Sequence, residues 1–131
     1  MNSFFLRIAG VLGAISVATG AFAAHTLKSI VTPEILQIFE TAVKYQFYHV
    51  IALLITGMLY KEYAGKKLLW AGWLFITGII LFSGSLYLLC LLKHLYPADR
   101  FWVGAITPLG GICFITGWLL LATGVRNKAT L

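Results

Sequence analysis

Four long apolar segments alternate with short polar stretches along this chain. They cover residues 4–24, 45–60, 68–92 and 101–125, and the last two contain no charged residue. A helix needs about 20 mostly apolar residues to cross the hydrocarbon core of a bilayer. Because no water satisfies backbone groups there, helices are the stable form for such segments. The pattern predicts an all-α membrane protein, with residues 1–131 forming a single four-transmembrane-helix bundle.

An amphipathic helical stretch is predicted between the first and second spans. Thr32-Pro33-Glu34 has the features of a helix start: a capping hydroxyl, a proline in the first turn and a carboxylate at the positive helix end. Apolar residues follow at helical spacing, and Glu40 precedes Lys44 in the favourable i,i+4 order. The stretch either lies at the membrane surface or continues directly into the second span.

The first apolar segment has a second interpretation. Arg7, the apolar run after it and Ala21-Phe22-Ala23 before Ala24 also resemble a secretory signal with an A-x-A cleavage site. However, three apolar residues at positions 4–6 precede the basic side chain, which blurs the charged region of a signal. We therefore expect a retained span, with a cleaved signal as the alternative.

The composition excludes an ordinary soluble domain. Hydrophobic residues make up 60% of the chain and charged residues 11%, whereas an average soluble domain is roughly 45–50% apolar and about 25% charged. The net charge of +6 comes from basic residues that flank apolar runs, which favours anionic headgroups over nucleic acid. Cys90 and Cys113 lie inside apolar runs without a CxxC motif, so we interpret them as small buried hydrophobes.

The basic residues also predict the orientation. With four spans, six Lys and Arg residues fall on the side of the termini: Arg7, Lys61, Lys66, Lys67, Arg126 and Lys128. Four fall on the other side: Lys28, Lys44, Lys93 and Arg100. The excess of positive charge predicts that both termini are cytoplasmic.

Small residues and one proline bear on the packing. Glycines recur seven residues apart, at Gly13 and Gly20 and along Gly110, Gly117 and Gly124, so each set lies on one helix face and permits close helix contacts. Pro108 either kinks a helix that begins at Phe101 or occupies the first turn of a helix that begins at Thr107. We favour the kink, because the shorter helix is barely long enough for a span.

The polar residues of the spans are predicted to collect in the outer leaflet. The alternation of spans brings eight of them to that side: His25, Tyr45, Gln46, His49, Ser83, Ser85, Tyr87 and Thr107. Polar side chains in lipid are costly without partners, and ionisable ones are candidates for function. Hydrogen bonding between helices is the leading interpretation. Ligand binding comes second, and a metal, haem or proton-transfer role for the histidines comes third.

Enzyme chemistry finds little support in the sequence. The acidic residues fall in loops or helix lead-ins, and no GxSxG or HExxH motif or paired intramembrane carboxylates are present. We expect no catalytic residue, no metal site and no cofactor. Seven aromatic residues mostly fit belts at the membrane interfaces: Trp70, Trp73, Tyr60, Tyr63, Tyr96, Trp102 and Trp118.

Five ordered motifs resemble a known family. They are Gly20-Ala21-Phe22-Ala23-Ala24-His25, Tyr45-Gln46-x-x-His49, Phe82-Ser83-Gly84-Ser85-Leu86-Tyr87, Thr107-Pro108-x-Gly110-Gly111 and Gly117-Trp118. Together they resemble the small four-span membrane proteins of domain-of-unknown-function family 423, over nearly the whole chain. The resemblance implies a four-helix inner-membrane protein with a retained first span, and it implies no activity. It marks six of the eight polar residues as motif positions: His25, Gln46, His49, Ser83, Tyr87 and Thr107.

The leading functional hypothesis is a non-enzymatic membrane protein whose polar cluster fixes the bundle and receives a lipid or a partner helix. Membrane lipids are the expected partners, together with a second copy of the chain or another membrane protein, and nucleic acid is not expected. An oligomeric channel or transporter for protons or a small solute is the first alternative. A redox subunit that binds haem or quinone through His25 and His49 is the second.

Overall fold

The computed structural model describes residues 1–98 and 101–126, and within them the chain is helical with no strand. The long helices are α1 (Ser3–His25), α2 (Pro33–Leu59), α3 (Lys66–Gly78), α4 (Gly84–Leu95) and α5 (Thr107–Gly124). Short turns of 3-10 helix, η1 (Leu27–Ser29) and η3 (Trp102–Ala105), precede α2 and α5. Four stretches are long and apolar enough to cross a membrane, which confirms the predicted four-helix bundle.

The third of these stretches is α3 and α4 joined without a break. A π-helical turn, η2 (Ile79–Ser83), links them, so residues 66–95 form one continuous span. Such turns insert extra backbone into an α-helix and occur often at functional sites. Ser83 lies in this turn, almost completely buried.

The helix starts follow from capping side chains. The Asn2 side chain accepts a hydrogen bond from the Phe5 amide at 3.2 Å, and Thr32 Oγ1 accepts one from the Ile35 amide at 3.4 Å. Pro33 and Glu34 occupy the first turn of α2, as their sequence predicts. From there α2 is uninterrupted to Leu59, so the amphipathic stretch is the first part of the second span rather than a separate surface helix.

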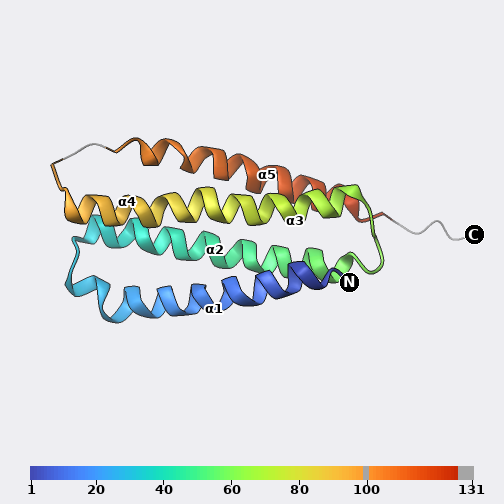
Figure 1. Cartoon of the computed structure of the whole chain (residues 1–131), viewed down its shortest axis with the longest axis horizontal. Coiled ribbons are helices and arrows are strands. Elements are labelled where there is room, and N and C mark those ends of the chain that lie inside the picture. The colour runs from blue at the N-terminus through green and yellow to red at the C-terminus, as the bar shows by residue number, and fades with distance from the viewer. Residues whose placement is uncertain (99–100, 127–131) are drawn as a thin grey trace, which may run out of the picture.

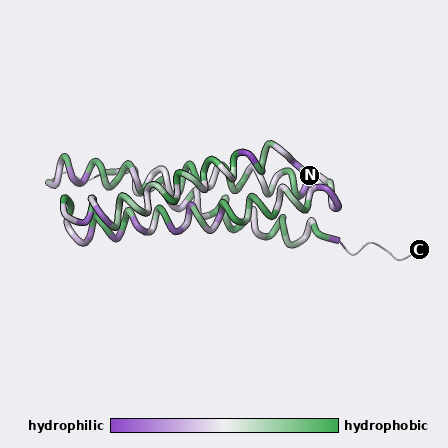
Figure 2. Tube along the Cα trace, turned by 90° about the horizontal axis from the view of Figure 1, so that it is seen from below, coloured by the Kyte–Doolittle hydropathy of each residue, from purple (hydrophilic) through white to green (hydrophobic). Residues whose placement is uncertain are grey.

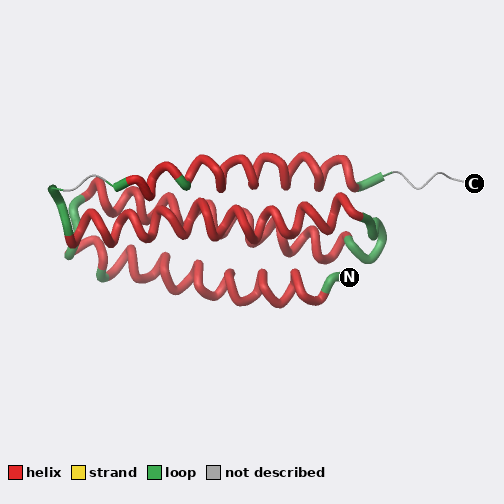
Figure 3. Tube along the Cα trace, turned by 45° about the horizontal axis from the view of Figure 1, so that its top comes forward, coloured by secondary structure: helices red, strands yellow, loops and turns green. Residues whose placement is uncertain are grey.

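The prediction of a kink at Pro108 was wrong. The α5 helix begins at Thr107 with Pro108 in its first turn, and the residues before it form η3. Figure 3 shows the corresponding break in the helical trace ahead of α5. The backbone N–H groups in the first turn of any helix have no carbonyl partner within that helix. A proline therefore costs little stability there, whereas in mid-helix it removes a hydrogen bond.

The helices form two hairpins that lie side by side. In Figure 1, α2 and the α3–α4 span are central, and α1 and α5 flank them on opposite sides. The N-terminus, the α2–α3 connection and the end of α5 share one end of the bundle, and the α1–α2 connection lies at the other. The ion pair between Lys93 and Glu34, 3.0 Å apart, joins α4 to α2 at that other end. Asp99, Arg100 and Lys128, which entered the sequence-based charge counts, lie outside the described residues.

Side chains pack into gaps left by glycines. A methyl group added to Gly110 would collide with the backbone of Phe82, and one on Gly72 would collide with the ring of Phe5. By contrast, a methyl group on Gly10 or Gly111 would meet no atom within 4 Å. The glycines at positions 110, 117 and 124 therefore permit close contacts inside the bundle. Lipid is as apolar as the side chains, so close packing is what holds the helices together.

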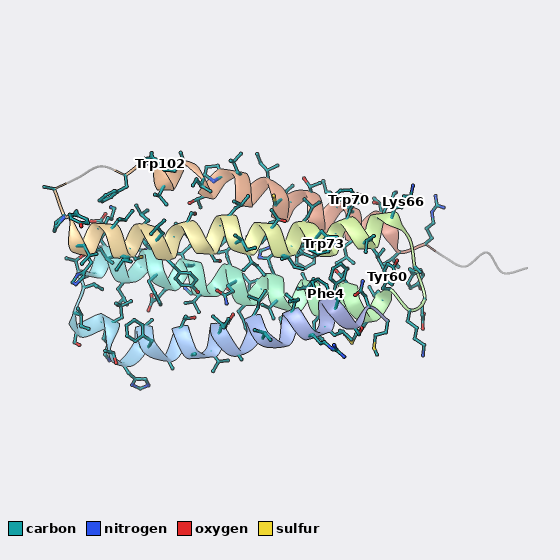
Figure 4. All side chains as sticks on the ribbon, in the orientation of Figure 1. Phe4, Tyr60, Lys66, Trp70, Trp73 and Trp102 are labelled. Atoms are coloured by element: carbon teal, nitrogen blue, oxygen red, sulfur yellow. The ribbon has the colours of Figure 1, made fainter. Side chains whose placement is uncertain are left out.

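Apolar side chains also cover the outer surface, as a bilayer requires. Figure 2 shows hydrophobic residues along the length of the tube. In Figure 4, Phe4, Tyr60, Trp70 and Trp73 gather toward the end that carries the N-terminus, and Trp102 lies toward the other end. Phe4 and Trp73 rings are 5.4 Å apart. This arrangement is typical of aromatic residues at the two membrane interfaces.

Candidate functional site

The centre of the bundle holds a hydrogen-bonded link among α1, α2 and α4. Gln46 is the middle residue of the 27-residue α2 and is only 3% exposed. Its Nε2 donates to the Leu12 carbonyl of α1 at 3.1 Å, and its Oε1 accepts from the Tyr87 hydroxyl of α4 at 2.8 Å. The Thr19 hydroxyl is 3.5 Å from the same Tyr87 oxygen. One amide side chain therefore joins three helices.

Two serines of the third span make the next contacts. The Ser83 hydroxyl donates to the Ala42 carbonyl of α2 at 2.7 Å. The Ser85 hydroxyl lies 2.7 Å from the Thr107 hydroxyl at the start of α5. An unpaired hydroxyl is costly in lipid, so these hydrogen bonds stabilise the contacts of the third span with α2 and α5.

His49 has a partner at each ring nitrogen. Its Nδ1 lies 2.6 Å from the Tyr45 carbonyl, and its Nε2 accepts from the Trp118 indole at 3.1 Å. Because a carbonyl only accepts and an indole N–H only donates, the two partners together assign a neutral ring with the proton on Nδ1. The ring also stacks on Phe114, with centroids 3.4 Å apart and planes 6° apart.

His25 lies apart from this cluster. It is exposed at the end of α1, whereas the α1 residue that faces Val50, the neighbour of His49, is Gly13. His25 is twelve residues further along the helix than Gly13, which is about 18 Å along the axis. The two histidines therefore cannot ligate one haem iron. In the described part of the chain, no three His, Cys, Asp or Glu side chains come together as metal ligands would.

The polar cluster is also deeper than the sequence analysis predicted. Because α2 begins at Pro33 rather than near Tyr45, Gln46 lies at mid-helix and His49 lies one turn closer to the end with the termini. Ser83, Ser85 and Thr107 do lie toward the other end. Tyr45 contributes its carbonyl, and its ring is 40% exposed beside Phe82. Within the described residues, no buried side-chain nitrogen or oxygen is without a partner.

An apolar pocket of about 270 Å³ opens next to this network, at the end away from the termini. It lies between the end of α1, the start of α2 and α4. Its walls are almost entirely apolar and consist of Phe22, Leu27, Ile30, Val31, Ile35, Phe39, Tyr87, Cys90, Leu91 and His94. The Phe39 and Tyr87 rings meet edge to face at 5.0 Å. Tyr87 thus presents its ring to the pocket and its hydroxyl to Gln46.

Several of these residues escaped the sequence analysis. Trp118 was assigned to an interfacial belt, yet its indole is the partner of His49. Phe22 and Phe39 were not singled out, and the connection between α1 and α2 brings them to one pocket. Cys90 is buried with its sulfur 3.5 Å from the Ile35 carbonyl, consistent with its interpretation as a small hydrophobe.

Residues 19–111, well over half of the chain, match the family described as "Protein of unknown function (DUF423)". The chain belongs to this family. Among DUF423 relatives, a UPF0382 membrane protein of Staphylococcus epidermidis is 44% identical over 128 residues, covering 95% of this chain and 99% of its own. The UPF0382 membrane protein YwdK of Bacillus subtilis is 36% identical over 118 residues, covering 89% and 91%. No solved structure matches.

Membership of DUF423 confirms the resemblance seen in the sequence motifs. The match spans all of α2, both halves of the third span and the start of α5, and therefore all eight predicted polar residues. The relatives are named as membrane proteins without an activity or a ligand.

Proposed function

We propose that this DUF423 protein is a non-enzymatic inner-membrane protein that binds a lipid acyl chain in the apolar pocket beside Tyr87. The proposal rests on the size and the apolar lining of this pocket. Its volume of about 270 Å³ is close to the lower end of the range for small-molecule sites, about 300–1,000 Å³. A partner helix, about 10 Å across, is too thick for it, whereas an acyl chain is slim and apolar.

The surroundings of the pocket fit an amphiphile. Its neighbours at the bundle end are charged, because Glu34 and Lys93 pair next to the lining residues Ile35 and His94. Its other wall reaches Tyr87 and Cys90, deeper in the bundle. A lipid could therefore keep its headgroup near the polar end while its chain contacts apolar side chains, which is how lipids orient in the membrane itself.

The polar network supports the same proposal because its side chains are already paired within the protein and do not compete for the ligand. Gln46, Ser83, Ser85 and His49 all bond to the protein. These side chains hold the walls of the pocket in place through Tyr87 and the third span. Their role in the proposal is to fix the bundle rather than to bind the ligand directly.

We also propose that both termini face the cytoplasm. At the end that carries the N-terminus and the end of α5 the structure describes five basic residues, Arg7, Lys61, Lys66, Lys67 and Arg126, together with Glu62. The other end has Lys28, Lys44 and Lys93 together with Glu34 and Glu40. The excess of basic residues favours the cytoplasmic side for the termini. Reporter fusions at each terminus test this, and reporter activity on the periplasmic or external side would contradict it.

The acyl-chain proposal is tested by narrowing the pocket. Leu91→Trp adds bulk to its wall, and Leu88→Trp makes the same change one turn away on α4, outside the lining and facing lipid. Both variants and the wild type are purified in mild detergent, and native mass spectrometry counts the phospholipids that stay bound. We expect fewer bound lipids in Leu91→Trp only. Equal retention in all three proteins would refute an acyl chain in this pocket.

A further inference from the structure

A second cavity lies at the opposite end of the bundle and has different chemistry. Its volume is about 440 Å³, and it lies between the α2–α3 connection and the end of α5. Its lining includes Lys66, Lys67 and Arg126, with Glu62 as the one carboxylate among the lining residues that the structure describes. Four charged side chains thus contribute a net charge of +2 around one concave site.

We propose that this cavity binds a phosphate group, as carried by the headgroup of an anionic phospholipid or by a soluble phosphate compound. Three cations converge on it from two separate parts of the chain, the start of α3 and the end of α5. Basic side chains around a concave surface attract phosphate by charge and by N–H donation. Neither Lys66 nor Arg126 makes an ion pair with a described residue.

The helix end adds to the positive potential. Gly65 precedes α3, and no side chain caps that end, so its first backbone N–H groups have no side-chain acceptor. Lys67 donates a hydrogen bond to the Thr123 carbonyl at 3.5 Å, which ties the start of α3 to the end of α5 beside the cavity. Glu62 opposes an anion, and its charge is outweighed by the three cations.

The position of the cavity suits a headgroup at the membrane surface. Figure 4 shows Lys66 at the end of the bundle next to Trp70 and not far from Tyr60, in the group of aromatic residues that marks this interface. Trp70 is 61% exposed one turn into α3. A phosphate in the cavity would therefore lie at the depth where anionic lipid headgroups lie.

Two variants with the same charge change test the site. Lys66→Gln/Arg126→Gln removes two cations from the cavity and leaves Lys67 on Thr123. Arg7→Gln/Lys61→Gln removes two cations from the same end of the bundle outside the lining. The proteins are placed in nanodiscs that contain phosphatidylglycerol and phosphatidylcholine, and bound lipids are identified by native mass spectrometry. Binding of inorganic phosphate is measured in detergent by calorimetry.

We expect the cavity variant to lose roughly tenfold in preference for phosphatidylglycerol, because each basic side chain near an anionic surface contributes several-fold. The control variant should change by less than about twofold. Loss of inorganic phosphate binding in the cavity variant, with no change in lipid preference, would assign the site to soluble phosphate. Equal effects of both variants, or no effect of either, would overturn the proposal. Circular dichroism melting checks that both variants fold, and the Leu91→Trp variant should leave these measurements unchanged.

Discussion

The indole of Trp118 donates a hydrogen bond to Nε2 of His49 across 3.1 Å, which joins α5 to α2 at the core of the bundle. This contact uses the only acceptor that a neutral His49 has, because Nδ1 carries the proton toward the Tyr45 carbonyl. The histidine is therefore a structural element between helices rather than an open ligand for a metal or haem.

Replacing Trp118 by Phe should destabilise the protein by about 1 kcal/mol, the usual size of a hydrogen bond between membrane helices. The substitution keeps an aromatic ring but leaves the acceptor of His49 without its donor. Trp70→Phe is the control, because Trp70 is 61% exposed and makes no side-chain hydrogen bond in the described residues. Thermal unfolding in detergent, followed by circular dichroism, measures both. Equal melting temperatures for the two variants would contradict the role of this bond.

Gln46 and Tyr87 should show energetic coupling. Tyr87→Phe and Gln46→Leu each remove one side of a 2.8 Å hydrogen bond. The double variant should therefore lose less unfolding free energy than the two single variants lose together. The expected coupling is roughly 0.6–1.7 kcal/mol. Tyr48→Phe with Gln46→Leu provides the control cycle, since Tyr48 is 55% exposed on the lipid side of α2. Additive effects in the first cycle would mean that the bond does not form.

Two neighbouring glycines should respond differently to the same change. Gly110→Ala puts a methyl group into the backbone of Phe82 and should destabilise the bundle by roughly 1–3 kcal/mol. Gly111→Ala puts it where no atom lies within 4 Å, so stability should be unchanged or slightly higher. Unfolding by titration with a denaturing detergent compares them. A large loss for Gly111→Ala would show that this face of α5 has a contact beyond the single chain.

The two cysteines should differ in reactivity. Cys90 is 5% exposed at the wall of the apolar pocket, and Cys113 on α5 is more exposed. Since accessibility limits thiol reactions, a membrane-permeant maleimide should label Cys113 faster. In the variant Cys113→Ser, added phospholipid should slow the labelling of Cys90, because an occupied pocket covers it. A labelling rate independent of added lipid would count against occupancy of the pocket.

The spans could be predicted from the sequence because hydropathy reports the transfer of each side chain into lipid, independent of its neighbours. The start of α2 was visible in Thr32-Pro33-Glu34 for a similar reason, since capping is local. Pro108 was not predicted correctly, because the choice between a kink and a helix start depends on whether the residues before it form the 3-10 turn η3 or a further turn of α-helix.

The partners of the polar residues depend on packing between helices, which the sequence does not encode locally. Trp118 lies in an apolar run, and nothing near it in the chain indicates that it faces His49. The depth of Gln46 was misjudged because hydropathy placed the beginning of the second span at Tyr45, although the helix begins twelve residues earlier. Polar side chains at the start of α2 lowered the local hydropathy without ending the helix.

Tyr87 contributes to two structures at once, since its ring lines the apolar pocket and its hydroxyl bonds to the amide that joins three helices. A molecule in the pocket that holds this ring in place favours the folded bundle over the separated helices. Binding and folding are then thermodynamically linked, and added ligand raises the midpoint of unfolding. The same protein would thus have a different lifetime in membranes of different lipid content, with no change in its sequence or its rate of synthesis.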